Sequence, residues 1–236
     1  MRLFQCAFWR ALVGIALFVA ISGATPASAG LFYDVRFGQD IYEATPGSQV
    51  SVDVFFRETA TGASIPRVAP GGLNGIFSLG AGVRFESTTG VSPARILQPD
   101  DILLGPLLSD VFFQQREVLS DTEARFQGFS ADFIAGVETA PIASGVHEFR
   151  FATLNFTAGT EIGEVTQLTL QDFDVTADSV SVDFTVLDDL IRFGDATIEV
   201  VSGNQVVPEP ATGAASIVFI SILALRRRGR TRVVNQ

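Results

Sequence analysis

The chain has 236 residues, 47% of them hydrophobic, and a formal net charge of −10. This combination excludes an acidic disordered tail and a nucleic-acid-binding protein. All 26 acidic residues lie between Asp34 and Glu209, where nine arginines leave a formal charge of −17. Such a surface repels phosphate backbones and anionic lipids and attracts divalent cations.

Residues 1–29 have the three parts of a secretory signal peptide. Two arginines in the first ten residues precede an apolar run, and Ala27-Ser28-Ala29 places small side chains where signal peptidase reads them. We expect cleavage between Ala29 and Gly30. Because Cys6 is the only cysteine and lies in the removed part, disulfides, thiolate metal sites and cysteine nucleophiles are excluded from the mature chain.

The main body follows as one domain over residues 30–203, in which apolar and polar side chains alternate with a period of two. Val50, Val52 and Val54 alternate with Ser51 and Asp53. This pattern is typical of strands with one face on a core and one in water. Eight segments show it or are rich in strand-forming residues: 33–37, 50–54, 77–85, 125–133, 149–156, 165–170, 180–186 and 196–200.

So many short strands predict an all-β, antiparallel sandwich. In the seventh segment Val180, Val182, Phe184 and Val186 are expected on the core side, and in the third Ser78, Gly80 and Gly82 are expected in water. In the fifth segment the phase changes, which predicts a bulge near Ala152-Thr153 or burial on both faces. Residues 99–115 are less regular and are expected to form a short helix or to cap one end.

Four segments in this body are similar, in order and spacing, to cohesin-like domains, which are jelly-roll sandwiches in the style of carbohydrate-binding modules. These segments are 46–54, 75–85, 151–157 and 193–200. The resemblance implies a non-catalytic module at a cell surface.

The sorting tail, residues 204–236, has three parts. The motif at 207–210 contains Pro208, Glu209 and Pro210, an uncharged apolar span covers 211–225, and a basic segment at 226–236 begins with Arg226, Arg227 and Arg228. Prolines end a helix on the outer side, and arginines stop it on the cytoplasmic side. The span would cover roughly 22 Å as a helix, so we expect a single membrane helix with snorkelling arginines or a transient insertion.

This tail resembles the PEP-CTERM sorting domain of exported bacterial proteins. The resemblance implies recognition by an exosortase, a membrane-embedded cysteine transpeptidase that cuts near the tripeptide. Pro208, Glu209 and Pro210 would be recognition residues, and Arg226 to Arg228 the membrane stop signal. The expected route is an inner-membrane intermediate and then the cell surface or extracellular matrix.

Residues suited to catalysis are few. His147 is the only histidine, so a multi-histidine metal site is excluded, and a solvent-exposed loop position is the commoner alternative to a catalytic role. Paired acids could serve a glycosidase, but the mature chain has no tryptophan and only Tyr33 and Tyr42 for stacking on sugars. We therefore expect no enzyme activity and a structural or adhesive role, with carbohydrate binding as the alternative and a glycoside hydrolase third.

Calcium is the one candidate ion, and no other cofactor is expected. The densest groups of acids beside loops are Asp172 and Asp174 with Asp178, then Asp100-Asp101, and Asp188-Asp189. Asp172, Asp174 and Asp178 are the candidate ligands, because calcium takes carboxylate and carbonyl oxygens. The alternative is a solvated acidic surface. The expected partners are signal peptidase and exosortase during export, then an extracellular polysaccharide or another surface protein.

Overall fold

The structure is a computed structural model that describes residues 30–71, 75–89, 92–108, 110, 113–173 and 178–203. The signal peptide, Asp174 and the sorting tail with its membrane span lie outside the described residues, so the predictions made for them stay predictions. In the described ranges, no helix has the length and apolar character needed to cross a bilayer.

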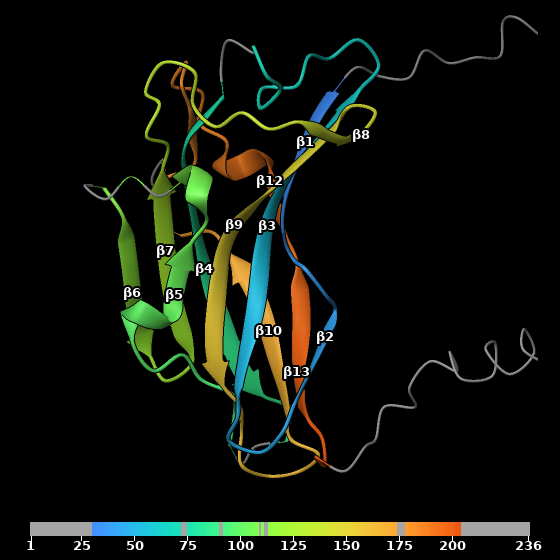
Figure 1. Cartoon of the computed structure of the whole chain (residues 1–236), viewed down its shortest axis with the longest axis vertical. Coiled ribbons are helices and arrows are strands. Elements are labelled where there is room, and N and C mark those ends of the chain that lie inside the picture. Colours follow the sequence, from blue (N-terminus) through green and yellow to red (C-terminus); the bar gives the residue numbers. More distant parts are fainter. Residues whose placement is uncertain are drawn as a thin grey trace, which may run out of the picture. The chain divides into compact units, whose positions relative to one another are not determined.

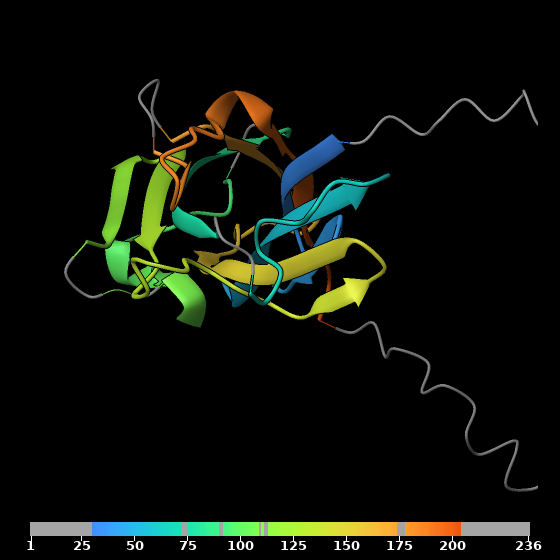
Figure 2. The same cartoon turned by 90° about the horizontal axis from the view of Figure 1, so that it is seen from above.

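Two β-sheets face each other and form a sandwich (Figures 1 and 2). The first sheet has the order β12 (Ile191–Phe193), β1 (Gly30–Phe37), β3 (Gln49–Thr61), β9 (Val146–Thr157) and β5 (Ile102–Leu104), with β8 (Pro141–Ala143) paired to β9. The second has the order β2 (Ile41–Ala44), β13 (Asp195–Val200), β10 (Val165–Gln171), β4 (Ile76–Ser87), β7 (Glu123–Phe129) and β6 (Gln115–Ser120), with β11 (Val180–Ser181) paired to β4. The predicted all-β sandwich is confirmed.

Two strand pairs are parallel, which corrects the expectation of an entirely antiparallel sandwich. Tyr33 of β1 pairs with Ile191 of β12, and Ile41 of β2 pairs with Thr197 of β13. The cause is that the chain crosses from the first sheet to the second between β1 and β2 and again between β12 and β13. At the second crossing Gly194 bridges the sheets, since its N–H donates to Val35 (3.0 Å) and its carbonyl accepts from Leu170 (3.0 Å).

The core lies between the sheets and is built from the inward side chains that the alternation predicts. Val52 and Val54 of β3 and Val83 and Phe85 of β4 are fully buried. Phenylalanines from opposite sheets meet there, with the Phe85 and Phe156 rings 5.4 Å apart. Burying each such side chain contributes about 1.5–3 kcal/mol.

The phase change in β9 is a bulge, as predicted, one residue before the expected place. Val54 of β3 pairs with Ala152, and the next residue, Phe55, pairs with Arg150. Phe151 is therefore the extra residue, and Phe151 and Ala152 are both buried.

The strand predicted over 180–186 is wrong beyond its first two residues. β11 ends at Ser181, and Phe184 lies in a turn with a φ of 61° and is 83% exposed. The Asp183 carboxylate explains the turn, because it accepts hydrogen bonds from the Ser181 hydroxyl and from the Thr185 N–H (3.2 Å). Local bonds of this kind compete with strand pairing.

Two further expectations are corrected in detail. The strand predicted over 125–133 ends at Phe129. Residues 99–115 contain the short strand β5 between two 3-10 turns, η1 (Pro99–Asp101) and η2 (Pro106–Leu108). A third such turn is η3 (Asp188–Leu190), directly before β12.

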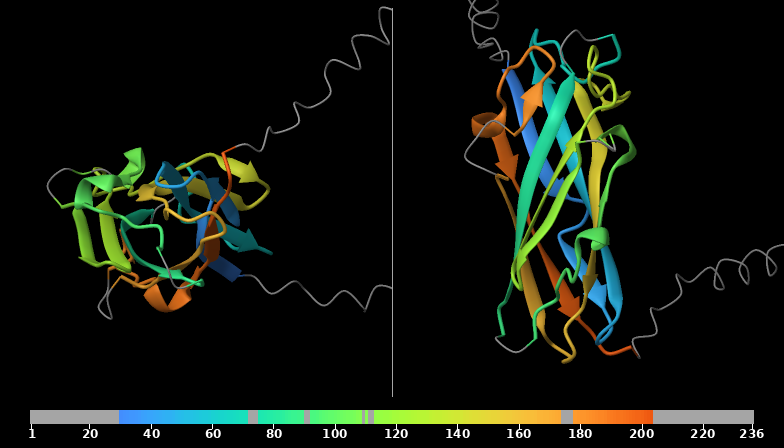
Figure 3. Two further views of the ribbon diagram at one scale, coloured as in Figure 1. Left: turned by 90° about the horizontal axis from the view of Figure 1, so that it is seen from below. Right: turned by 90° about the vertical axis from the view of Figure 1, so that its left-hand side faces the viewer.

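The sandwich has two different ends (Figures 1 and 3). At one end, here called the loop pole, β3 and β7 finish and β4 and β9 begin, as shown by the pairs Gly30 with Thr61 and Ser78 with Phe129. At the other end, the tail pole, β4 finishes and β10 begins, and β13 ends at Val200. The described parts of three connections, 62–71, 130–140 and 178–190, therefore gather toward the loop pole.

Candidate functional site

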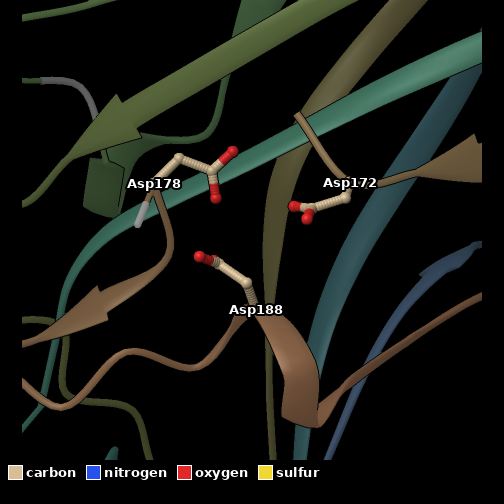
Figure 4. Close-up of side chains that lie close together, drawn as sticks. All are labelled: Asp172, Asp178 and Asp188. Carbon is tan, nitrogen blue, oxygen red and sulfur yellow. The ribbon is translucent and has the colours of Figure 1, made fainter. Parts of the chain in front are cut away.

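Three aspartates converge on the outer side of the second sheet. Asp172 follows β10, Asp178 precedes β11, and Asp188 begins η3. Each offers a carboxylate oxygen, and these oxygens lie within 4.8 Å of one another, with the carboxylates turned toward a common space (Figure 4). The structure thus brings together two residues of the first acidic group, Asp172 and Asp178, with Asp188 of the Asp188-Asp189 pair.

The aspartates come this close to the sheet because β4 has glycines on its outer face. A Cβ atom at Gly80 would lie only 2.7 Å from Asp178 Oδ2, and one at Gly82 would lie 3.4 Å from the carbonyl oxygen of Asp172. The expectation that Ser78, Gly80 and Gly82 lie in water is wrong, because Asp172, Phe173 and the 178–190 segment lie on them. Without side chains at the two glycines, the segment can pack directly on the strand.

Hydrogen bonds from the sheet hold the segment in place. The carbonyl of Asp178 accepts from the Ser78 hydroxyl (2.7 Å) and from Gln127 Nε2 (3.0 Å). The N–H of Ser179 donates to Asp188 Oδ1 (2.9 Å), and the Ser179 hydroxyl donates to Asp178 Oδ1 (3.1 Å). Two of the three carboxylates are therefore positioned by defined donors.

The electrostatics of the cluster are dominated by Asp178, which is 4% exposed. Burial, followed by the neighbouring Asp188 and Asp172, raises its pKa to about 7. Carboxylates this close together resist ionising together, most of all where one of them is buried, as Asp178 is. Near neutral pH the cluster can be balanced by a shared proton or by a hard cation with oxygen ligands, and calcium binding stays a prediction.

A second polar group ties the 180–186 turn to the loop after β3. Arg67 Nη1 donates to Asp183 Oδ1 (3.0 Å) and to the Ser181 hydroxyl (3.2 Å). Hydrogen bonds from Ser181, and then from Thr185 and Arg67, hold the pKa of Asp183 well below its usual range. Asp183 is therefore charged at neutral pH and fixes the turn to Arg67.

Sequence reasoning missed a buried polar group inside the loop pole. Glu58 is fully buried and accepts the backbone N–H groups of Arg67 (2.9 Å) and Val68 (3.0 Å). Its neighbours in the sheet are Tyr33 and His147. Burial, followed by the charge of Glu58, raises the pKa of Tyr33 to about 12.

His147 lies in β9 and is buried, which corrects the solvent-exposed alternative. Its Nδ1 donates to the Thr139 carbonyl (2.8 Å). Among the described residues, every buried side-chain nitrogen and oxygen has a hydrogen-bond partner. The pattern is that of a satisfied structural network.

Four phenylalanines form an aromatic patch at the loop pole, defined here as Phe77, Phe113, Phe129 and Phe133. Phe77 and Phe129 are half-buried. Neighbouring rings lie 5.5 to 6.4 Å apart, and Phe113 and Phe133 are 51% and 53% exposed. A cavity of about 320 Å³ lies on the same 130–138 loop, lined in part by Leu107, Ser130, Asp132 and Glu138.

Comparison with known proteins gives no family: no protein-family model matches the chain. No curated protein matches it either. Among solved structures, the chain is similar to the cohesin CaCohA2 from Clostridium acetobutylicum, at 12% identity over 72% of this chain and 92% of that one, with a TM-score of 0.43. It is also similar to a type III cohesin module from the cellulosomal ScaE cell-surface anchoring scaffoldin of Ruminococcus flavefaciens, at 13% identity over 74% and 91%, with a TM-score of 0.44. A third similar structure is AvmM, which catalyses macrocyclisation in alchivemycin A biosynthesis, at 11% identity over 75% and 92%, with a TM-score of 0.30.

Proposed function

We propose that this chain is an exported, exosortase-sorted protein of the cell surface or extracellular matrix, and that its sandwich has a non-catalytic, structural or adhesive role. The observation that carries the proposal is the aromatic patch at the loop pole, at the opposite end from the last strand of the sandwich. Once an exosortase has cut the chain near Pro208-Glu209-Pro210, the sandwich would be held at the surface through this patch.

The patch has the chemistry of a contact surface. Large exposed apolar groups that lie together mark interaction sites on monomeric proteins. Aromatic side chains bury much area at small entropic cost when they are already ordered. Asp132 orders this loop, because its Oδ1 accepts the N–H groups of Ile134 (2.9 Å) and Ala135 (2.9 Å), the two residues that follow Phe133.

The negative charge around the aromatic patch indicates which kind of partner can bind there. Hydrogen bonds from Ala135 and then Ile134 lower the pKa of Asp132, so this carboxylate is charged beside the patch. Glu138 lines the same cavity, and the stretch from Asp34 to Glu209 carries −17. We therefore propose, as the occupant, an apolar and positively charged segment of another surface protein, because charge complementarity excludes acidic partners.

Two changes to the full chain in its native host test adhesion and sorting separately. The double variant Phe113→Ala with Phe133→Ala should be exported and processed normally but be released from the cell surface into the medium. Glu209→Ala, by contrast, should remain uncut in the inner membrane, as should a chain without Arg226 to Arg228.

Phe32→Ala is the matched control, since this phenylalanine is 42% exposed on the other sheet, away from the patch. It should leave surface retention unchanged, as measured by immunoblots of cell and medium fractions. Equal retention of the double variant and the wild type would contradict the adhesive role, and normal processing of Glu209→Ala would contradict the sorting assignment. Turnover of a matrix glycan that is lost when a pair of acids is changed to amides would overturn the non-catalytic role.

A further inference from the structure

A second hollow lies far from the aromatic patch, on the outer face of the first sheet where the chain crosses between sheets. It has a volume of about 260 Å³ and is lined by residues of the β1–β2 crossover and of β3: Gly38, Gln39, Tyr42, Ser51, Asp53 and Phe55. None of these residues contributes to the acidic cluster or to the patch. This hollow is called the crossover pocket below.

The missing side chain of Gly38 opens the crossover pocket. The Gly38 N–H donates to the Asp53 carbonyl (2.9 Å), which fixes the crossover against β3. A Cβ atom at this position would lie 3.0 Å from Phe55 Cε2 and 3.6 Å from the Tyr42 hydroxyl. The φ of Gly38 is outside the left-handed region, so the backbone does not require glycine here. The effect of the glycine is to leave the volume of the crossover pocket unfilled.

Polar groups in the pocket are held in fixed positions. Asp53 Oδ1 accepts the Thr153 hydroxyl (2.5 Å), and Arg150 Nη1 lies 3.9 Å from the same oxygen. The Tyr42 hydroxyl accepts the Gln39 N–H (3.0 Å) and can donate its own hydrogen to a ligand. Asp53 Oδ2 offers a second acceptor, so a donor and an acceptor stand beside the ring of Phe55.

We infer that the crossover pocket binds one neutral hexose unit of a polysaccharide. An aromatic ring beside a carboxylate and a hydroxyl suits a sugar, whose C–H face contacts the ring while its hydroxyl groups bond to the polar atoms. The volume suits a single ring, because it is below the range of drug-sized ligands. The carboxylate in the pocket and the −17 charge of the stretch from Asp34 to Glu209 disfavour uronic and sulfated sugars.

The neighbouring surface suits the continuation of such a chain. Beside the pocket, the Ser51 hydroxyl donates to Asn155 Oδ1 (2.8 Å), which places further hydroxyl and amide groups along β3 and β9. The sequence disfavours sugar binding because tryptophan and tyrosine, the usual residues that stack on sugars, are scarce. In this pocket, phenylalanine supplies the ring and Tyr42 supplies a hydroxyl.

An array of hexasaccharides tests the inference, with glucose, mannose and galactose oligomers beside the corresponding uronic acid oligomers. The mature protein purified from its host should bind at least one neutral hexasaccharide and none of the acidic ones. Gly38→Val fills the pocket and Asp53→Asn removes the charged acceptor, and each should weaken binding to the selected hexasaccharide at least tenfold. If Gly38→Val fails to fold, Gly38→Ala adds the smallest side chain and should weaken binding in the same direction.

Asp34→Asn is the matched control, because Asp34 lies on β1 opposite Arg57 and outside the pocket lining. It should bind as the wild type does, and thermal melting should show that all variants are folded. No binding to any neutral hexasaccharide, binding to uronic acids alone, or equal binding by the wild type, Asp53→Asn and the pocket-filling variant would each overturn the inference. The Phe113→Ala, Phe133→Ala double variant should keep full sugar binding, so this test is independent of the adhesive role.

Discussion

The outer faces of the two sheets differ, although the strands beneath them follow the same alternation. On the first sheet, β3 places Asp53, Phe55 and Arg57 outward, and this face is open enough to hold the crossover pocket. On the second sheet, β4 places Ser78, Gly80 and Gly82 outward, and Asp172, Phe173 and Asp178 cover them. In this sandwich, the sheet face is covered where the outward residues of the central strand are small and open where they are large.

A side chain added at a glycine should lower the stability of the protein much more on the covered face than on the open face. Gly80→Val would place Cβ 2.7 Å from Asp178 Oδ2 and 2.9 Å from Phe173 Cβ, so the covering segment must shift, at a cost of about 3 kcal/mol. Gly38→Val, on the open face, should cost less than about 1 kcal/mol, because the contact is with the end of the Phe55 ring. Urea unfolding measures both, and equal losses would show that the covered face is not tightly packed.

A second difference between the two faces is expected in how the free energy of unfolding depends on pH. The pKa of Asp178 rises from 3.8 to about 7 on folding, so between these values the folded state holds more protons than the unfolded state. The free energy of unfolding should therefore fall as the pH rises through this window and level off above it. Asp178→Asn should flatten this dependence and stabilise the protein by about 2 kcal/mol at pH 8.

Urea titrations at pH 5 and pH 8, in a buffer with a chelator, check this prediction. Asp34→Asn, on the open face, is the control and should leave the dependence as it is in the wild type. A wild-type stability that rises between pH 5 and pH 8 would contradict the raised pKa.

The smallest effect concerns calcium at the covered face. At a calcium concentration about five times the dissociation constant, binding adds about 1 kcal/mol, which corresponds to a rise of roughly 2–4 °C in Tm for a domain of this size. The rise should disappear in Asp178→Asn and in Asp188→Asn. No rise at millimolar calcium, or an equal rise with magnesium or with added salt, would remove a specific calcium site.

The sequence predicts what depends on local pattern. The strands with inward Val52, Val54, Val83 and Phe85 follow from alternation, and the bulge in β9 follows from the change of phase, because each of these signals lies within a single segment. The turn at Asp183 cannot be predicted from alternation, because its side-chain hydrogen bonds compete with strand pairing over 180–186. The buried Glu58 cannot be predicted from its own strand, because its donors, Arg67 and Val68, lie in the loop after β3.

The candidate site was predictable only in part, for a similar reason. Asp172 and Asp178 are close in sequence and Asp188-Asp189 is a pair of acids, so local density marks both groups as candidates. That they share one site could not be predicted, because it depends on hydrogen bonds from the Leu187 N–H to the Ser179 carbonyl (2.8 Å) and from the Ser179 N–H to Asp188 Oδ1 (2.9 Å). The crossover pocket depends on an absent side chain at Gly38, which no motif records.

The place of β13 in the second sheet has a mechanical consequence for a protein that is pulled at its C-terminal end. β13 pairs with β10, and β10 pairs with β4, which contains Phe77 of the aromatic patch. A force between the end of β13 at the tail pole and a partner on the patch would pass through these two strand pairs and load their hydrogen bonds together, in shear, instead of opening them one after another. Resistance to pulling would then depend on the hydrogen bonds that β10 makes with its two neighbours.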